Sequence, residues 1–156
     1  MFKKISGWKK TLLLILIAVV GVYLLVYIDV VLRARSAYLE GEKYWRWHEH
    51  PEEKVAYLNQ QEQKELAALD KKLARKKISP DEYEQQKEII KFNYERLRSE
   101  SSIKYAYVWY QTAVELFSPP ESKWVKLARE KMPRAKELWK EELRRKKILF
   151  EDYMLE

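Results

Sequence analysis

The residues best suited to chemistry lie in one short stretch, YWRWHEHPEEK, which runs from Tyr44 to Lys54. It holds both histidines of the chain, His48 and His50, with acidic residues between and after them. Imidazole and carboxylate groups are common metal ligands, so the stretch raises the hypothesis of a metal site. On a helix, side chains two residues apart point about 200° away from each other. His48 and His50 are therefore weak metal candidates, which could share an ion only if the stretch is extended and Glu52 or Glu53 assists.

The other residue types argue against an enzyme. There is no cysteine, which excludes disulfides, thiolate nucleophiles, zinc–cysteine sites, iron–sulfur clusters and covalent c-type haem. Gly7, Gly21 and Gly41 are isolated from one another, so the chain has neither a phosphate-binding loop nor a nucleophile elbow. The many carboxylates alternate with lysines and arginines, as on solvated helix faces. We therefore predict that the protein is not an enzyme, with no catalytic residue and no cofactor.

One apolar segment, Thr11 to Leu32, stands apart from the rest of this charged chain. The 21 residues from Leu12 to Leu32 would make a helix of about 31 Å, close to the ~30 Å hydrocarbon core of a bilayer. The run is longer than the apolar part of a signal peptide, and Arg35 disfavours cleavage after Ala37. We therefore predict an uncleaved signal anchor, with residues 11–32 as a transmembrane helix after a basic tail of residues 1–10.

Polar residues in and around this segment indicate how it would sit in a membrane. We expect contacts with lipid headgroups from the basic residues Lys9, Lys10, Arg33 and Arg35. Lysines and arginines are equally frequent on the two flanks, so the positive-inside rule does not decide the orientation. The short lysine-rich tail favours a bacterial inner-membrane protein with a cytoplasmic N-terminus and a periplasmic C-terminal domain. Tyr23, Tyr27 and Asp29 are candidates for membrane helix contacts, although Asp29 could instead reach Arg33 or the headgroups.

Beyond the span, the sequence predicts a helical extension and then a helical hairpin. The extension should cover residues 33–50, because Pro51 is the first proline and disfavours helix in the residue before it. Residues 51–100 carry thin apolar stripes among many charges, as in a charged antiparallel helical hairpin. Ser79 and Glu82 fit a capping box at the start of its second helix.

An aromatic-rich helical core is predicted for residues 101–147, followed by a C-terminal tail of residues 148–156. The segment from Ile103 to Phe117 is apolar on most sides, which is typical of a helix buried on most sides. The side chains expected in the core are Tyr107, Trp109, Tyr110, Trp124 and Trp139. After it, Ser118 and Glu121 fit another capping box, and Pro133 should kink the last helix or begin a new one.

The hairpin resembles the short C-terminal (SHOCT) type of helical hairpin. The resemblance covers LDKKLARKKISPDEYEQQKEII, residues 69–90, and is carried by Leu69, Leu73, Ile78, Ser79, Glu82, Tyr83 and Lys87. Lys77 replaces the glycine usual before the isoleucine, and the hairpin is central instead of terminal. The resemblance implies self-association through the 52–98 hairpin, or docking of a partner.

The core resembles a degenerate tetratricopeptide repeat over residues 106–128. Ala106, Tyr110 and Ala113 have the spacing of the second helix of that repeat, and a proline follows. Downstream, the next first helix is matched by Trp124, Leu127 and Ala128, and upstream Gly41 and Tyr44 match Gly-x-x-Tyr. The full repeat period is missing. The predicted fold class is thus all-α, with a single transmembrane signal-anchor helix followed by a helical-hairpin and tetratricopeptide-like bundle.

These patterns favour a non-catalytic protein that works through protein contacts. Aromatic residues dominate interface hot spots, and the candidate partner-binding residues are Tyr44, Trp45, Trp47, Trp109 and Trp124. The predicted function is a single-pass membrane accessory or scaffold subunit that presents a helical protein-binding surface. It would serve the assembly or stabilisation of an envelope membrane complex. Its expected partners are the membrane and other subunits of that complex, with no nucleic acid.

Two alternative functions stay open. One is a metal- or cofactor-supporting subunit of a membrane redox or transport complex, using His48, His50 or Asp29. The other is binding of anionic lipid or nucleic acid by a basic C-terminal helix, if that helix is cytoplasmic. Between Glu121 and Lys147 there are 11 lysines and arginines against 5 glutamates, although this spacing also suits intrahelical ion pairs.

Overall fold

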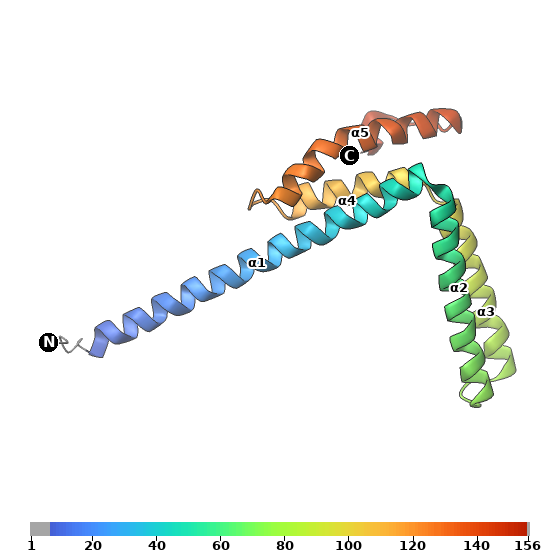
Figure 1. The fold of residues 1–156 in the computed structure, drawn as a ribbon, viewed down its shortest axis with the longest axis horizontal. Coiled ribbons are helices and arrows are strands. Elements are labelled where there is room, and N and C mark those ends of the chain that lie inside the picture. The colour runs from blue at the N-terminus through green and yellow to red at the C-terminus, as the bar shows by residue number, and fades with distance from the viewer. Residues whose placement is uncertain (1–6, 156) are drawn as a thin grey trace.

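The fold is all-α, as predicted. The computed structural model describes residues 7–155, which form five α-helices and one short 3-10 helix and include no strand. In chain order the helices are α1 (Gly7–Glu49), α2 (Pro51–Ala74), α3 (Pro80–Ser99), α4 (Ser102–Leu116), α5 (Lys123–Arg145) and η1 (Asp152–Leu155). Figure 1 shows α4 and α5 lying along the second half of α1, whereas α2 and α3 turn away together as a separate arm.

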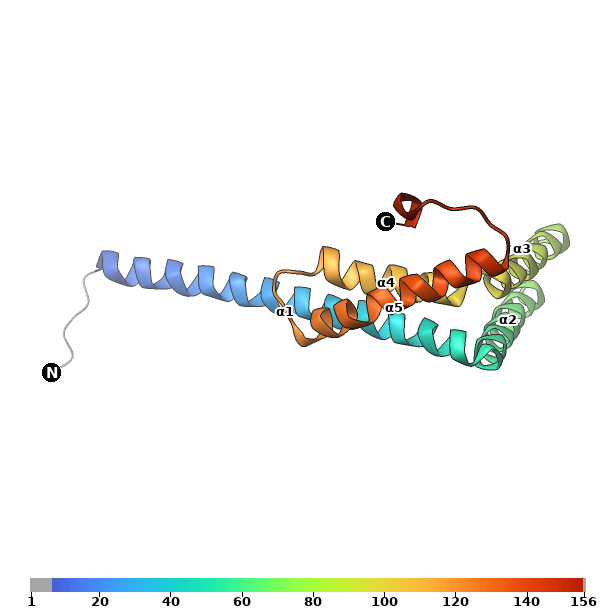
Figure 2. The same cartoon turned by 90° about the horizontal axis from the view of Figure 1, so that it is seen from above.

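Helix α1 is a continuous rod of 43 residues, about 64 Å long. Its first half projects beyond the other helices (Figure 2), and no residue in the most apolar stretch of this helix is buried by the rest of the protein. Among the described residues, α1 is the one helix that is long and apolar enough to cross a membrane. It begins at Gly7, inside the predicted basic tail, and residues 1–6 of that tail lie outside the described residues.

The arm formed by α2 and α3 is an antiparallel hairpin, and its turn has the predicted capping box. The Glu82 N–H donates to Ser79 Oγ at 3.2 Å, and the Ser79 N–H donates to Glu82 Oε2 at 2.8 Å. Along the seam, Leu58 and Leu69 of α2 are buried, but α3 has no buried residue. The hairpin is therefore held by a narrow seam and leaves most of its surface open.

The core lies between the second half of α1 and the helices α4 and α5. Small side chains at the crossings, Ala37, Ala106, Ala113, Ala128 and Ala135, are all buried and let the helix backbones approach closely. The Tyr110 ring fills the space beside them and is fully buried. Gly41 on α1 makes room for this ring, because a Cβ there would lie 2.5 Å from Tyr110 Cε1.

Two predictions about the last helical region can be compared with the structure. The second capping box, at Ser118 and Glu121, is wrong: the N-cap of α5 is Ser122, whose Oγ accepts from the Val125 N–H at 3.4 Å. Ser118 Oγ instead donates to Glu121 Oε1 within the loop before the helix. Of the two outcomes expected at Pro133, no new helix begins there, since α5 continues through this exposed residue.

The C-terminal segment docks on the bundle through its last turn. Leu155 in η1 is buried, and its carbonyl oxygen accepts a hydrogen bond of 2.9 Å from the Tyr107 hydroxyl. Lys140 on α5 forms an ion pair of 2.9 Å with Asp152. These contacts close the α4–α5 side of the core.

Candidate functional site

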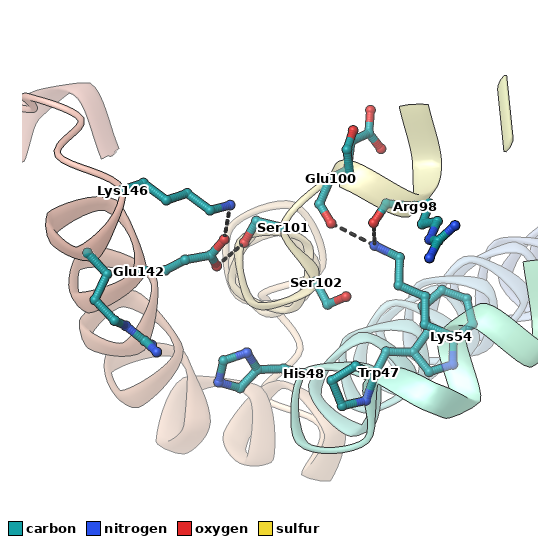
Figure 3. Close-up of a pocket in the computed structure, with 12 residues that line it drawn as sticks. Trp47, His48, Lys54, Arg98, Glu100, Ser101, Ser102, Glu142 and Lys146 are labelled. Atoms are coloured by element: carbon teal, nitrogen blue, oxygen red, sulfur yellow. Dashed lines mark hydrogen bonds and ion pairs between the residues drawn. The ribbon is translucent and has the colours of Figure 1, made fainter. Parts of the chain in front are cut away.

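The helical corner between α1 and α2 is the place where the bundle meets the hairpin arm. A shallow cavity of ≈ 340 Å³, which we call the corner cavity, opens there. It is lined by Trp47, His48, Pro51, Lys54, residues 98–102, Glu142, Arg145 and Lys146. Figure 3 shows these side chains converging from α1, α2, α5 and the link between α3 and α4. The cavity therefore lies where the bundle helices α1 and α5 meet α2 and the α3–α4 junction of the arm.

Lys54 is the central residue of this corner. Its side chain is buried, and Nζ donates to the carbonyl oxygens of Glu100 at 2.6 Å and Arg98 at 3.3 Å. These are carbonyls at the end of α3, which have no partner within the helix. Burial lowers the pKa of Lys54, against the opposing effect of the Glu100 and Glu142 carboxylates. Lys54 therefore fastens the end of α3 to the start of α2.

A second polar cluster on the opposite wall of the corner cavity joins α5 to the start of α4. Glu142 accepts from Ser101 Oγ and from Lys146 Nζ, both at 2.5 Å. Ser101 Oγ also caps α4 by accepting from the Lys104 N–H at 3.2 Å. Burial raises the pKa of Glu142, but the hydrogen bonds from Lys146 and Ser101 outweigh it and leave this pKa lowered. The Ser101 hydroxyl caps α4, and the Glu142 carboxylate binds this hydroxyl and Lys146, so the cluster stabilises the corner.

Of the aromatics predicted to bind a partner, Trp47 is buried by the chain's own helices and Tyr44 is half-buried by them. Tyr44 stacks on Tyr105 of α4, with ring centroids 5.2 Å apart, and meets the edge of Trp47 at 5.1 Å. Trp47 is 8% exposed and lies 5.1 Å from the Tyr57 ring of α2. Lys43 Nζ lies over both Tyr44 and Trp47, at 4.9 and 5.3 Å from their centroids. These two aromatics pack between bundle and arm and also line a cavity of ≈ 120 Å³ with Tyr57 and Tyr105, and their contact with another protein remains a prediction.

The other three predicted partner-binding aromatics are half-buried against the core. Trp45 lies 6.4 Å from the Tyr110 ring, and Trp109 packs against the buried cluster. Trp124 lies 5.7 Å from Tyr38. Each is partly covered by the chain, and contact of the uncovered part with another protein remains a prediction.

A long-range polar link that was not predicted ties α1 to α4 and α5. Glu42 accepts from Tyr110 Oη at 2.6 Å and from Lys131 Nζ at 2.7 Å. Burial raises the pKa of the Glu42 carboxyl, but the hydrogen bonds from Lys131 and Tyr110 outweigh it, so this pKa is lowered. Burial also raises the pKa of Tyr110 well above its usual range, with the hydrogen bond to Glu42 adding to it. The link fixes the rotation of α1 against its two neighbours.

The two histidines are separated by the corner itself. His48 is half-buried and lines the corner cavity, whereas His50 is exposed at the N-cap of α2. His50 Nδ1 lies 3.3 Å from Glu52 Oε1. Across residues 7–155, no group of three or more histidine, aspartate or glutamate side chains is arranged to hold a metal ion.

The three residues predicted to contact another membrane helix, Tyr23, Tyr27 and Asp29, have two kinds of neighbour within the chain. Asp29 Oδ2 accepts from Arg33 Nε at 2.7 Å, which is the local pairing considered as the alternative to a partner helix. Tyr23 and Tyr27 instead line a cleft together with Pro119 and Pro120, in the loop between α4 and α5. Contact of these residues with another membrane helix remains a prediction.

The headgroup candidates lie at the two ends of the apolar segment. Arg35 stacks over Trp124, with Cζ 5.6 Å from the ring centroid, and Arg33 pairs with Asp29. Lys10 is exposed, and the Lys9 side chain lies outside the described part of the chain. On the basic helix α5 and at its C-cap, ion pairs neutralise four cations, namely Arg129, Lys131, Lys140 and Lys146.

The described residues thus define an all-α protein with one helix able, by length and composition, to span a membrane. Comparison with protein-family models, with curated proteins and with solved structures finds no match for this chain. The resemblances to the tetratricopeptide repeat and to the SHOCT hairpin therefore remain predictions from the sequence.

Proposed function

We propose that the protein is a non-catalytic, single-pass membrane scaffold subunit that holds a helical protein-binding arm beside the membrane. Helix α1 is the anchor, with its N-terminus in the cytoplasm and the helical domain on the other side of a bacterial inner membrane. The arm is the α2–α3 hairpin, and its partner is another protein of an envelope complex or a second copy of this chain. The observation that carries the proposal is the open, partly apolar surface of this projecting arm.

The surface of α3 away from α2 has the composition of a docking site. Ile89 and Phe92 are 57% and 65% exposed and lie three residues apart, so they are neighbours on one helix face. The seam with α2 uses other positions, including Tyr94, whose hydroxyl donates to Asn59 Oδ1 at 2.6 Å. Covering an exposed side chain of this size contributes about 1.5–3 kcal/mol. A partner helix over this patch would complete the burial that α3 lacks.

The corner gives such an arm a fixed direction. Lys54 caps α3, and the Trp47–Tyr57 contact packs α2 against the end of α1. A docking arm held at a set angle loses less freedom on binding than one on a flexible linker. This supports a scaffold role, in which position relative to the membrane matters.

Site-specific crosslinking in native membranes tests the proposal. A photoreactive amino acid at Phe92 should capture a discrete protein product, identified by mass spectrometry, whereas the same group at exposed Gln63 on α2 should not. Ile89→Ser should abolish the product without unfolding the bundle, because Ile89 contributes nothing to the buried core. A product mass of two chains would identify self-association. Absence of a product at Phe92, or equal capture from Gln63, would refute the arm as a docking surface.

The orientation is tested separately by a reporter of periplasmic location fused at the C-terminus. A periplasmic signal is expected from the proposed arrangement. A cytoplasmic signal would contradict it and would favour the basic face of α5 as a site for anionic lipid.

A further inference from the structure

The loop between α4 and α5 touches the part of α1 that would lie in the membrane. A cleft of ≈ 220 Å³ is lined by Tyr23, Val26, Tyr27, Val30, Pro119 and Pro120. The first four belong to the apolar segment of α1, and the two prolines belong to the loop. Figures 1 and 2 both place this loop at the end of the bundle nearest the projecting half of α1. The bundle therefore does not stand clear of the span but overlaps its last turns.

The depth of this contact follows from the helix geometry. The cleft runs along α1 from Val30, two residues inside Leu32, to Tyr23, nine residues inside it, which are about 3 and 14 Å from the end of the apolar segment, with Tyr27 at about 8 Å. An interfacial segment buries its apolar face about 5–10 Å into the boundary between headgroups and acyl chains. The loop prolines reach the level at which such a segment inserts.

The side chains of the loop and its neighbours suit this level. Leu116 is 70% exposed at the end of α4, and Pro119 in the following loop is also exposed. In the first turn of α5, Trp124 has two cations over its ring, with Lys123 Nζ at 4.5 Å and Arg35 Cζ at 5.6 Å from the centroid. Tryptophan and basic side chains are the residues that membrane proteins place at headgroup level, with apolar side chains below them. Their contacts with α1 follow the same order, because the prolines share a cleft with residues 23–30, and Trp124 contacts Arg35 and Tyr38 farther along the helix.

We propose that residues 116–120, the membrane-facing loop, insert into the interface of the bilayer that α1 spans, with Trp124, Lys123 and Arg35 among the headgroups. This inference rests on the proposed anchor role of α1. The ligand is the lipid surface itself, selected by continuity with the span and by the cations around Trp124. The bundle then has two attachments to the membrane, α1 and this loop, which together fix its rotation about the α1 axis.

The absence of cysteine allows a clean test, because every single-cysteine variant carries one reporter. Full-length variants with Leu116→Cys, Leu149→Cys or Leu14→Cys are labelled with a polarity-sensitive fluorophore. They are reconstituted in vesicles of phosphatidylethanolamine and phosphatidylglycerol, with and without brominated lipid as a quencher. Leu149 is the matched control because it is 98% exposed in the C-terminal segment, and Leu14 reports the span itself. Pro119→Cys provides a second reporter in the loop.

The expected result is a shift to shorter wavelength and quenching by brominated lipid at Leu116, with neither change at Leu149. If Leu14 is quenched while the Leu116 and Pro119 reporters behave like Leu149, the anchor stands and the inserted loop is refuted. If Leu14 is not quenched either, the anchor role fails and the loop proposal fails with it. Circular dichroism of each labelled variant confirms that the helical fold is retained.

Discussion

The close approach of Gly41 to Tyr110 makes one substitution informative about the whole core. In Gly41→Ala, the new Cβ would lie 2.5 Å from Tyr110 Cε1 and 2.7 Å from Cδ1. Carbon atoms pack at about 3.5–4.0 Å, so the ring or α1 must move by about 1 Å. The ring has little freedom to do so, because it is fully buried and its hydroxyl is bound to Glu42 at 2.6 Å.

The expected magnitude is the difference between two effects. Overpacking a core costs about 1–3 kcal/mol, and the fixed ring places this site near the upper limit. Alanine in a helix interior is favoured over glycine by about 1 kcal/mol. The net loss should be about 2 kcal/mol, which lowers the midpoint of thermal unfolding by about 8 °C for a domain of this size.

The assay is thermal unfolding of the full chain in detergent micelles, followed by tryptophan fluorescence and circular dichroism. The control is the same substitution in a Tyr110→Val background, which removes the ring atoms that the new methyl would meet. There, Gly41→Ala should be neutral or stabilising, because only the helix preference remains. An equal effect in both backgrounds, or a stabilising effect in the native chain, would refute the packing argument.

Three further predictions concern the corner, the polar link and the caps. Lys54→Met keeps the side-chain stem but leaves the carbonyls of Arg98 and Glu100 without their donor, and should cost about 1–3 kcal/mol. Hydrogen exchange should then accelerate at the end of α3 and not in the middle of α4; unchanged exchange would contradict the capping role. The pKa of Glu42 is depressed below its ordinary value of 4.5, so its stabilising effect is present above that pH and is lost as the pH falls through the folded-state pKa. Glu42→Gln should make the unfolding midpoint less sensitive to pH in this acid range. An unaltered pH profile would show that the contacts of Glu42 with Tyr110 and Lys131 do not cause this pH dependence. Ser79→Ala and Ser122→Ala should each cost about 1 kcal/mol and speed exchange only in the first turn of α3 and of α5, respectively. Loss of protection in both helices from either change would show that the caps are not independent.

The predictable parts of this fold are those that depend on residues close together in the sequence. The capping box at Ser79 needs only two residues three positions apart, and it is present as predicted. The buried face of α4 follows from its apolar periodicity, and Ile103 and Tyr110 are fully buried as expected. The second capping box failed for a local reason, since Ser118 and Ser122 both precede acceptable helical residues. Sequence alone does not rank two such caps.

The parts that could not be predicted depend on which helices meet. Glu42 and Lys131 are 89 positions apart, and no local pattern marks either of them among so many charges. In the sequence, Lys54 does not differ from the other lysines of a charged helix, because its burial depends on the end of α3 lying beside it. Its place in the first turn of the hairpin's first helix, which an antiparallel hairpin brings close to the end of the second helix, was the one signal for its role.

The candidate partner surface illustrates the same limit. Their aromatic character shows that Tyr44 and Trp47 are stabilised by burial, but it does not show whether another protein or the same chain buries them. In the structure Tyr105 of α4 covers part of Tyr44, and Tyr57 of α2 packs against Trp47. Exposed apolar residues of the arm, Ile89 and Phe92, carried no periodic signal because a pair is too short to form a stripe.

The unbroken course of α1 from span to corner has a mechanical consequence. The α1 backbone has no hinge between the apolar segment and the bundle, so any tilt of the span is transmitted as a rigid rotation. From Leu32 to Glu49 the lever is about 26 Å long, and a tilt of about 10° would displace the corner by about 4–5 Å. If α1 is the membrane anchor that we propose, its tilt would respond to hydrocarbon thickness, and the position of the α2–α3 arm would then change with the thickness of the membrane.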